Sequence, residues 1–268
     1  MKKVLLVILL ATLLVPMYLM FKSSLESAMG LLAMPPSLIP TSFTFFHYKY
    51  LLTQTEGILR MAMNTIMICV ATIVGGIIVT LMAGFAFQSK WPGQKIVVGL
   101  FLLSSVLPLM VLIIPRYLLM RIVGIKGGFV AAVLPHIYSP VGILIARAWM
   151  IQTGPSFVEQ ARLQGAGELQ VLWHVVVPMS MPVVGLQIIG LGIDVMGDFL
   201  WQMMTLPMPN QQTLLVGLMN SMAVLTGPGR PDPVGLHMAM GVVLLVPMVA
   251  VFLIGQKLFV SEGKGLVL

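Results

Sequence analysis

Charged side chains are scarce in this sequence. Asp, Glu, Lys and Arg together account for 9% of its 268 residues, whereas soluble proteins carry about 25%. The mean hydropathy is +1.04, so the chain has too few charges to cover a surface that faces water. We therefore expect an integral membrane protein. The net charge of +7 is scattered and forms no basic run, which argues against a nucleic-acid-binding protein.

Several chemical features are also missing. The single cysteine, Cys69, lies inside an apolar run, so no disulfide can form within the chain. His and Cys do not cluster, which argues against a metal site. The sequence has no glycine-rich phosphate loop, and it lacks the inverted halves of many secondary transporters. We therefore expect no catalytic residues and no cofactor here, and any ATP and magnesium that drive the protein must be bound by another polypeptide.

Long apolar runs are what the sequence has instead. A transmembrane helix needs about 20 apolar residues, and the runs predict an all-α integral membrane fold with six transmembrane helices. They cover residues 4–21, 61–87, 96–114, 127–149, 182–206 and 235–259. Pro108 predicts a kink in the third run. Lys and Arg residues nearly balance on the two sides, so charge alone leaves the orientation open.

Residues 157–182 form the longest stretch in the second half that is too polar to cross a membrane. Pro155 suits the first turn of a helix, and Gly165 and Gly167 interrupt the helical pattern. Apolar residues then return at helical spacing up to Pro178, which we expect to close a second helix. The pattern predicts a helix, a tight turn and a second helix, whose polar side must meet a partner outside the bilayer.

This stretch resembles the cytoplasmic coupling motif of ATP-binding-cassette (ABC) importer permeases. The matching positions are Glu159, Ala161, Gly165, Ala166 and Pro178. Gln160 and Gln164 stand where the motif has an Ala and an Asp, which puts any salt bridge from the Asp position in doubt. Residues 197–201 and the C-terminal tail are similar to the carbohydrate-uptake class, which includes maltose-, glycerol-phosphate- and trehalose-type permeases.

The resemblance implies a single transmembrane permease domain over residues 1–268, with a permease core at 61–260 and a cytoplasmic coupling loop at 155–180 between helices 4 and 5. It implies a multi-pass protein of the prokaryotic cytoplasmic (inner) membrane that forms a heterodimer with a second permease subunit. The other implied partners are an ATPase dimer that holds ATP and magnesium, an extracytoplasmic substrate-binding protein and the lipid bilayer. In the family the motif Glu, here Glu159, pairs with a basic residue of the ATPase, and the glycine lets the helix turn.

Asp194 and Asp198 are the leading candidates for a substrate pathway. They lie one helical turn apart and so share a face, and an intramembrane carboxylate usually faces a cavity or a partner. Carboxylates bind sugar hydroxyls, and the ring of Trp201 could stack on a sugar. A role for Asp198 in ordering the loop alone stays open. Asn64 and Asn220 are weaker candidates, because buried amides often hold helices together.

Other functions remain open at this stage. The importer could carry another solute, such as glycerol phosphate, a polyamine or a peptide. The sequence shows no cation beside the two carboxylates, which disfavours a phosphate. His136 is isolated in the sequence, so we expect a structural role for it. An ion-coupled secondary carrier would work without an ATPase, and a membrane hydrolase would need a nucleophile–base pair or a metal cluster.

Overall fold

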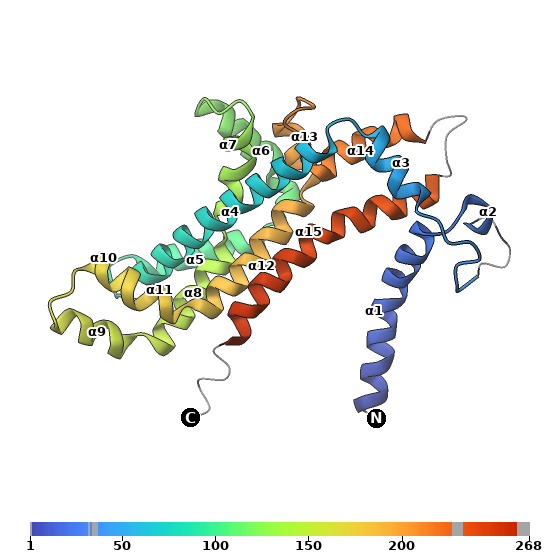
Figure 1. The fold of residues 1–268 in the computed structure, drawn as a ribbon. Helices are drawn as coiled ribbons and strands as arrows, with labels where there is room; N and C mark the ends of the chain where they lie inside the picture. The colour runs from blue at the N-terminus through green and yellow to red at the C-terminus, as the bar shows by residue number, and fades with distance from the viewer. Residues whose placement is uncertain (1, 32, 34–36, 227–232, 262–268) are drawn as a thin grey trace. The chain divides into compact units, whose positions relative to one another are not determined.

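The computed structural model describes residues 2–31, 33, 37–226 and 233–261 (Figure 1). Within these ranges the regular secondary structure is helical, and an isolated β-bridge joins Glu26 and Phe43. The elements are α1 (Lys2–Ser24), α2 (Ala28–Leu31), α3 (Phe46–Gln54), α4 (Ile58–Ala86), α5 (Gln94–Val106), α6 (Leu109–Ile122), α7 (Phe129–Val133), the 3₁₀ turn η1 (Leu134–Ile137), α8 (Pro140–Thr153), α9 (Pro155–Leu163), α10 (Glu168–Val171), the π turn η2 (Leu172–Val176), α11 (Val177–Met179), α12 (Met181–Gly197), α13 (Phe199–Thr205), α14 (Leu214–Leu225) and α15 (Pro233–Ser261).

Three helices are long and apolar enough to cross a membrane: α1 over Lys3–Ser24, α4, and α15 over Pro233–Phe259. Three further candidates are bent pairs: α5 with α6, α7 and η1 with α8, and the segment Glu168–Met179 with α12. The described part of the chain therefore has three to six candidate spans, and six transmembrane helices stays a prediction.

The predicted third span, residues 96–114, is broken rather than kinked. Helix α5 ends at Val106, and the chain resumes as α6 at an angle of 116°. A residue before proline is disfavoured in the α conformation, and Leu107, which precedes Pro108, is extended with φ −70° and ψ 125°. The first helix of the pair therefore stops before Pro108 instead of continuing to residue 114.

The predicted fifth span, residues 182–206, also consists of two helices. Helix α12 ends at Gly197, and α13 starts beyond Asp198. Oδ1 of Asp198 accepts a hydrogen bond from the backbone N–H of Trp201 at 3.0 Å. This is the geometry of a helix N-cap, so the aspartate that the sequence places inside a span begins a new helix.

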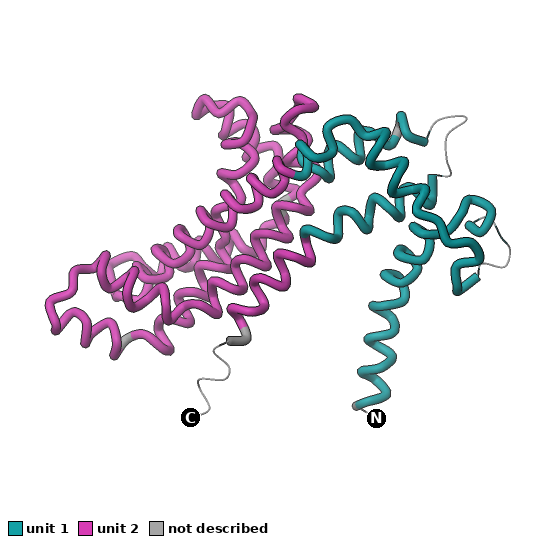
Figure 2. The backbone as a smooth tube through the Cα atoms, in the orientation of Figure 1, with its two compact units in different colours: residues 1–62, 213–247 teal, residues 63–212, 248–268 magenta. Residues whose placement is uncertain are grey.

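The chain divides into two compact units (Figure 2), which comprise residues 1–62 with 213–247 and residues 63–212 with 248–268. The core of the first unit includes the buried side chains of Leu51, Leu218 and Leu236. The core of the second unit includes Val171 and Val183 and joins the short helices near residue 171 to α8 and α12.

The residues with predicted functions lie at two ends of the second unit. Figure 1 shows α9 and α10 at one end of this unit, and α6, α7 and α13 at the opposite end. The predicted coupling segment and the predicted pathway residues of α12 and α13 therefore lie at opposite ends of one compact unit. Helix α12 runs from Met181 to Gly197 between them.

Helices α12 and α15 approach each other backbone to backbone within the second unit. A Cβ atom added to Gly185 would lie 2.6 Å from the carbonyl oxygen of Gly255, and one added to Gly255 would lie 2.7 Å from the carbonyl oxygen of Gly185. Small residues permit this approach between membrane helices. A helix backbone cannot move aside as the tip of a side chain can, so the two glycines set the distance between the helices.

We expect Gly185→Ala to destabilise the protein by about 1–3 kcal/mol, the usual cost of an overpacked contact. Gly190→Ala is the matched control, because it lies on the same helix and its Cβ would meet nothing within 4 Å. Thermal unfolding in detergent measures the effect. Equal melting temperatures for the two variants would contradict the proposed role of the Gly185–Gly255 contact.

Glu26 organises the segment that follows α1. Its buried carboxylate pairs with Lys22, and its Oε1 accepts hydrogen bonds from the backbone N–H and the hydroxyl of Thr41 at 2.9 and 2.7 Å. Nε2 of His47 lies 3.0 Å from its carbonyl oxygen. Burial by itself would raise the pKa of Glu26, but Lys22 and Thr41 outweigh it and hold that pKa below its ordinary value of 4.5.

This lowered pKa predicts a loss of stability in acid. The folded-state pKa lies below the unfolded one, so the contribution of Glu26 is fully present above the unfolded value and disappears as the pH falls through the folded value. We expect the melting temperature to fall more steeply between about pH 5 and about pH 3 in the wild type than in Glu26→Gln, which cannot titrate. Parallel pH profiles would count against this role.

Candidate functional site

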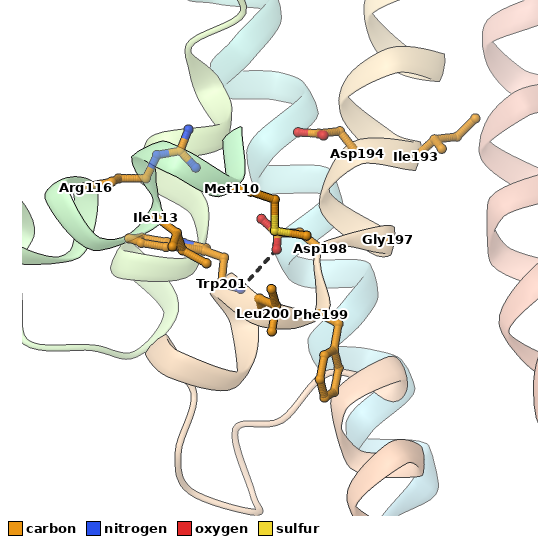
Figure 3. Close-up of a pocket in the computed structure, with 10 residues that line it drawn as sticks. All are labelled: Met110, Ile113, Arg116, Ile193, Asp194, Gly197, Asp198, Phe199, Leu200 and Trp201. Carbon is orange, nitrogen blue, oxygen red and sulfur yellow. Dashed lines mark hydrogen bonds between the residues drawn. The ribbon is translucent and has the colours of Figure 1, made fainter. Parts of the chain in front are cut away.

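A cavity of about 380 Å³ opens within the second unit, where α6, α12 and α13 meet (Figure 3). The breaks at Pro108 and Asp198 create the ends of these three helices. Most of the lining is apolar, and three of the lining residues carry charges. The lining residues are Met110, Ile113, Arg116, Ile193, Asp194, Gly197, Asp198, Phe199, Leu200 and Trp201.

His136 of η1 lies between the two carboxylates of this cavity. Its Nδ1 is 3.1 Å from Oδ2 of Asp194, and its Nε2 is 3.4 Å from Oδ2 of Asp198. The His136 side chain is 2% exposed, whereas those of Asp194 and Asp198 are 46% and 24% exposed. Both carboxylates face one imidazole, as expected for positions one turn apart. His136 is isolated in the sequence because its partners in the structure lie 58 and 62 positions away, and its structural role stays a prediction.

Trp201 is buried beside the cavity, with 0% of its surface exposed. Its indole Nε1 donates a hydrogen bond to the carbonyl oxygen of Ala131 at 3.0 Å, which ties α13 to α7. The guanidinium carbon of Arg116 lies 5.4 Å from the centre of the ring, a cation–π distance. In this structure the ring is therefore not free to stack on a sugar, and that role stays a prediction.

Arg116 is a charged residue of the cavity that sequence reasoning missed. Arg116 lies just beyond the predicted third run, residues 96–114, but in the structure it is part of α6 and lines the cavity together with Asp194 and Asp198. The argument that no cation stands near the carboxylates is therefore wrong. The sequence signal was an arginine within an apolar segment, since such residues usually face a cavity or a partner.

The two asparagine candidates are not among the residues that line the cavity. Nδ2 of Asn64 donates to the carbonyl oxygens of Asn210 and Gln212 at 3.0 Å each, so this amide holds the segment after α13. Asn220 is an exposed residue of α14 in the first unit. Pathway roles for Asn64 and Asn220 stay predictions.

The residues that match the coupling motif lie on and around α9. The Glu159 side chain is exposed, and no hydrogen bond or ion pair involves it within the ranges that the structure describes. Ala161 and Ala166 pack partly buried against the core of the second unit. Gly165 has φ +85°, a conformation that favours glycine, and so permits the turn after α9.

A salt bridge spans this turn. The guanidinium of Arg162 donates two hydrogen bonds to the carboxylate of Glu168, from Nε at 2.9 Å and from a terminal nitrogen at 3.0 Å. Such bidentate pairs add geometric definition to charge attraction. The pair holds the start of α10 against the end of α9, and it leaves the nearby carboxylate of Glu159 to solvent or to a partner.

The sequence pattern predicts that Pro178 closes the second helix, but this prediction is wrong. After α10 the chain continues through η2 into α11, and Pro178 lies within α11. A proline inside a helix removes one backbone hydrogen bond, and the wider π turn just before it changes the local pairing. The helix ends at Ser180, and the chain bends by 77° into α12.

Comparison with known proteins identifies relatives of this chain. The sequence profile of the family described as "binding-protein-dependent transport system inner membrane component" matches residues 75–262. The galactooligosaccharides transport system permease protein GanQ of Bacillus subtilis is 26% identical over 231 residues, which cover 84% of this chain and 80% of the relative. The sn-glycerol-3-phosphate transport system permease protein UgpE of Rhizobium meliloti is 24% identical over 259 residues, which cover 94% and 90%.

A solved structure shares the fold. It is the crystal structure of a bacterial ABC transporter involved in the import of the acidic polysaccharide alginate. One of its chains aligns with this protein at a TM-score of 0.81 and 22% sequence identity, and the alignment covers 96% of this chain and 94% of that chain. The family profile covers more than half of the sequence. The protein therefore belongs to the family of binding-protein-dependent transport system inner membrane components, which are permease subunits of ABC transport systems and not catalytic enzymes.

Proposed function

We propose that this chain is a permease subunit of an ATP-driven importer for a sugar or oligosaccharide, and that it forms half of the translocation pathway. The observation that carries this proposal is the cavity of about 380 Å³ with the half-exposed carboxylate of Asp194 in its wall. Carboxylates accept hydrogen bonds from sugar hydroxyls, and the apolar lining suits the less polar faces of sugar rings. Relatives named for galactooligosaccharide and arabinooligosaccharide transport support this substrate class.

The importer needs partners that this chain does not supply. We propose a heterodimer with a second permease subunit, a separate ATPase dimer that binds ATP and magnesium, and an extracytoplasmic binding protein that delivers the solute. The segment 159–178 is the proposed contact with the ATPase. Support comes from the exposed carboxylate of Glu159 and from the turn at Gly165, which together form a short, charged projection at one end of the second unit.

Glycerol phosphate is the second candidate substrate. Arg116 supplies the cation that a phosphate requires, and several relatives are named for sn-glycerol-3-phosphate transport. The nearby carboxylates of Asp194 and Asp198 would repel an anion, so we favour a neutral sugar over glycerol phosphate as the substrate. An ion-coupled carrier is disfavoured, because the family is defined by transport systems that depend on a binding protein.

Purification from mild detergent tests the assembly. We expect the tagged chain to recover an ATPase and a second permease, and the complex in vesicles, supplied with its binding protein, to take up labelled sugar when ATP is present. The uptake panel contains galactotriose, arabinotriose, maltotriose and glycerol 3-phosphate. A stable chain recovered alone would contradict the importer, and uptake of glycerol 3-phosphate alone would replace the sugar with the second candidate.

The charge of Glu159 should matter for coupling. Loss of a charge-assisted hydrogen bond costs about 1.5–3 kcal/mol, so we expect Glu159→Ala to weaken binding of the ATPase roughly tenfold or more and to reduce uptake in parallel. Gln160→Ala is the matched control, since Gln160 is its exposed neighbour on α9. Titration of purified ATPase against the permease dimer measures the effect. Equal affinities for the two variants would rule out this contact.

A further inference from the structure

The two carboxylates of the cavity differ in how many of their oxygens contact other groups of the protein. Oδ1 of Asp198 accepts the N-cap hydrogen bond from Trp201 at 3.0 Å, and its Oδ2 lies 3.4 Å from Nε2 of His136. Both oxygens therefore have protein groups close by, and the side chain is 24% exposed. The contacts of the Asp198 carboxylate therefore serve mainly to hold η1, α12 and α13 together.

Asp194 is different, because one of its oxygens remains open. Its Oδ2 lies 3.1 Å from Nδ1 of His136, while its Oδ1 has no hydrogen-bond partner among the residues that the structure describes. The side chain is 46% exposed and lines the cavity. His136 thus fixes one oxygen of Asp194 and leaves the other to accept a hydrogen bond from a bound molecule.

Arg116 offers the complementary group. Its guanidinium is held over the buried ring of Trp201, and within the described ranges it forms no hydrogen bond and no ion pair. Figure 3 shows the guanidinium of Arg116 and the carboxylate of Asp194 pointing toward one another. A guanidinium has five N–H donors and no acceptor. The cavity therefore presents free donors on α6 and a free acceptor on α12.

We propose that Asp194 and Arg116 are the residues of this chain that contact the transported solute and determine its specificity, and that His136, Asp198 and Trp201 act only by positioning them. A hydroxyl group both donates and accepts hydrogen bonds, so a neutral polyhydroxylated solute satisfies both residues. An anion would be repelled by Asp194, and a cation would be repelled by Arg116. This inference rests on the proposed function of the cavity in sugar import.

Transport kinetics of the complete complex in vesicles test the assignment, with the trisaccharide of the panel that the wild type takes up fastest. Asp194→Ala and Arg116→Ala should each raise KM roughly tenfold or more, the effect of one unpaired polar group. Asp194→Asn keeps an acceptor and Arg116→Gln keeps a donor, so both should return KM to within about threefold of the wild type. Vmax and the melting temperature should change little.

Asp198→Asn tests the positioning role assigned to Asp198. Asparagine is as good an N-cap as aspartate, so this variant should raise KM less than Asp194→Ala does. If instead Asp198→Asn raises KM and Asp194→Ala does not, the two roles are reversed and the inference is overturned. If Asp194→Glu and Arg116→Lys restore transport and the uncharged Asn and Gln variants do not, the solute is charged, and the proposed neutral solute is wrong.

His136 has its own test as a positioning residue. The amide nitrogen of an asparagine lies near the place of Nδ1 of a histidine, and that of a glutamine near Nε2. Since Nδ1 faces Asp194 and Nε2 faces Asp198, His136→Asn should keep KM closer to the wild type than His136→Gln does. A purely structural histidine would show equal KM values and differ only in melting temperature, and that result would remove His136 from the proposal.

The uptake measurements also distinguish failure of the Asp194 and Arg116 assignment from failure of the proposed sugar import, on which the assignment rests. Absence of sugar uptake by the wild-type complex would overturn both. Sugar uptake by the wild type together with a wild-type KM in both alanine variants would leave the importer in place and overturn the assignment of Asp194 and Arg116 alone.

Discussion

The carboxylate of Asp198 is the constraint on which the candidate site depends. By capping α13 it ends α12 at Gly197 and turns one apolar run into two helices. The same carboxylate faces His136, so the break in α12–α13 lies against the 3₁₀ turn in the preceding candidate span. Irregular backbone at membrane depth is tolerated where it is buried in protein or lines a cavity. Here it does both, and the cavity lies at the helix ends that the break creates.

Helix α12 connects the proposed coupling segment to the proposed pathway cavity within the second unit. It starts at Met181, directly after the segment that resembles a coupling motif, and ends at Gly197 in the cavity wall. The indole Nε1 of Trp149 donates to the carbonyl oxygen of Met179 at 2.9 Å, so α8 holds the bend before α12. A displacement of the short helices would therefore reach the cavity through one continuous helix, which is the geometry that the proposed coupling needs.

The residues proposed to contact the solute differ in burial from those proposed to position them. Trp201 and His136 are buried and make their polar contacts inside the protein, whereas Asp194 and Arg116 keep polar groups free. Residue type alone suggests the reverse, since a tryptophan beside aspartates is typical of sugar sites. The difference arises because the indole N–H must find a buried acceptor, and the carbonyl oxygen of Ala131 provides it.

Composition and local pattern sufficed for the class of protein, for the helices around α1, α4 and α15, for the glycine turn after α9 and for a pair of carboxylates that share one face. These features depend on hydropathy, on helical periodicity and on the conformational freedom of glycine, all of which act over a few residues. The tertiary structure alone decided that the third and fifth runs are broken, that Arg116 and His136 join the two aspartates, and that Trp201 is buried. Those outcomes depend on contacts between residues up to 85 positions apart, such as Arg116 and Trp201, and a local sequence pattern carries no information about such distances.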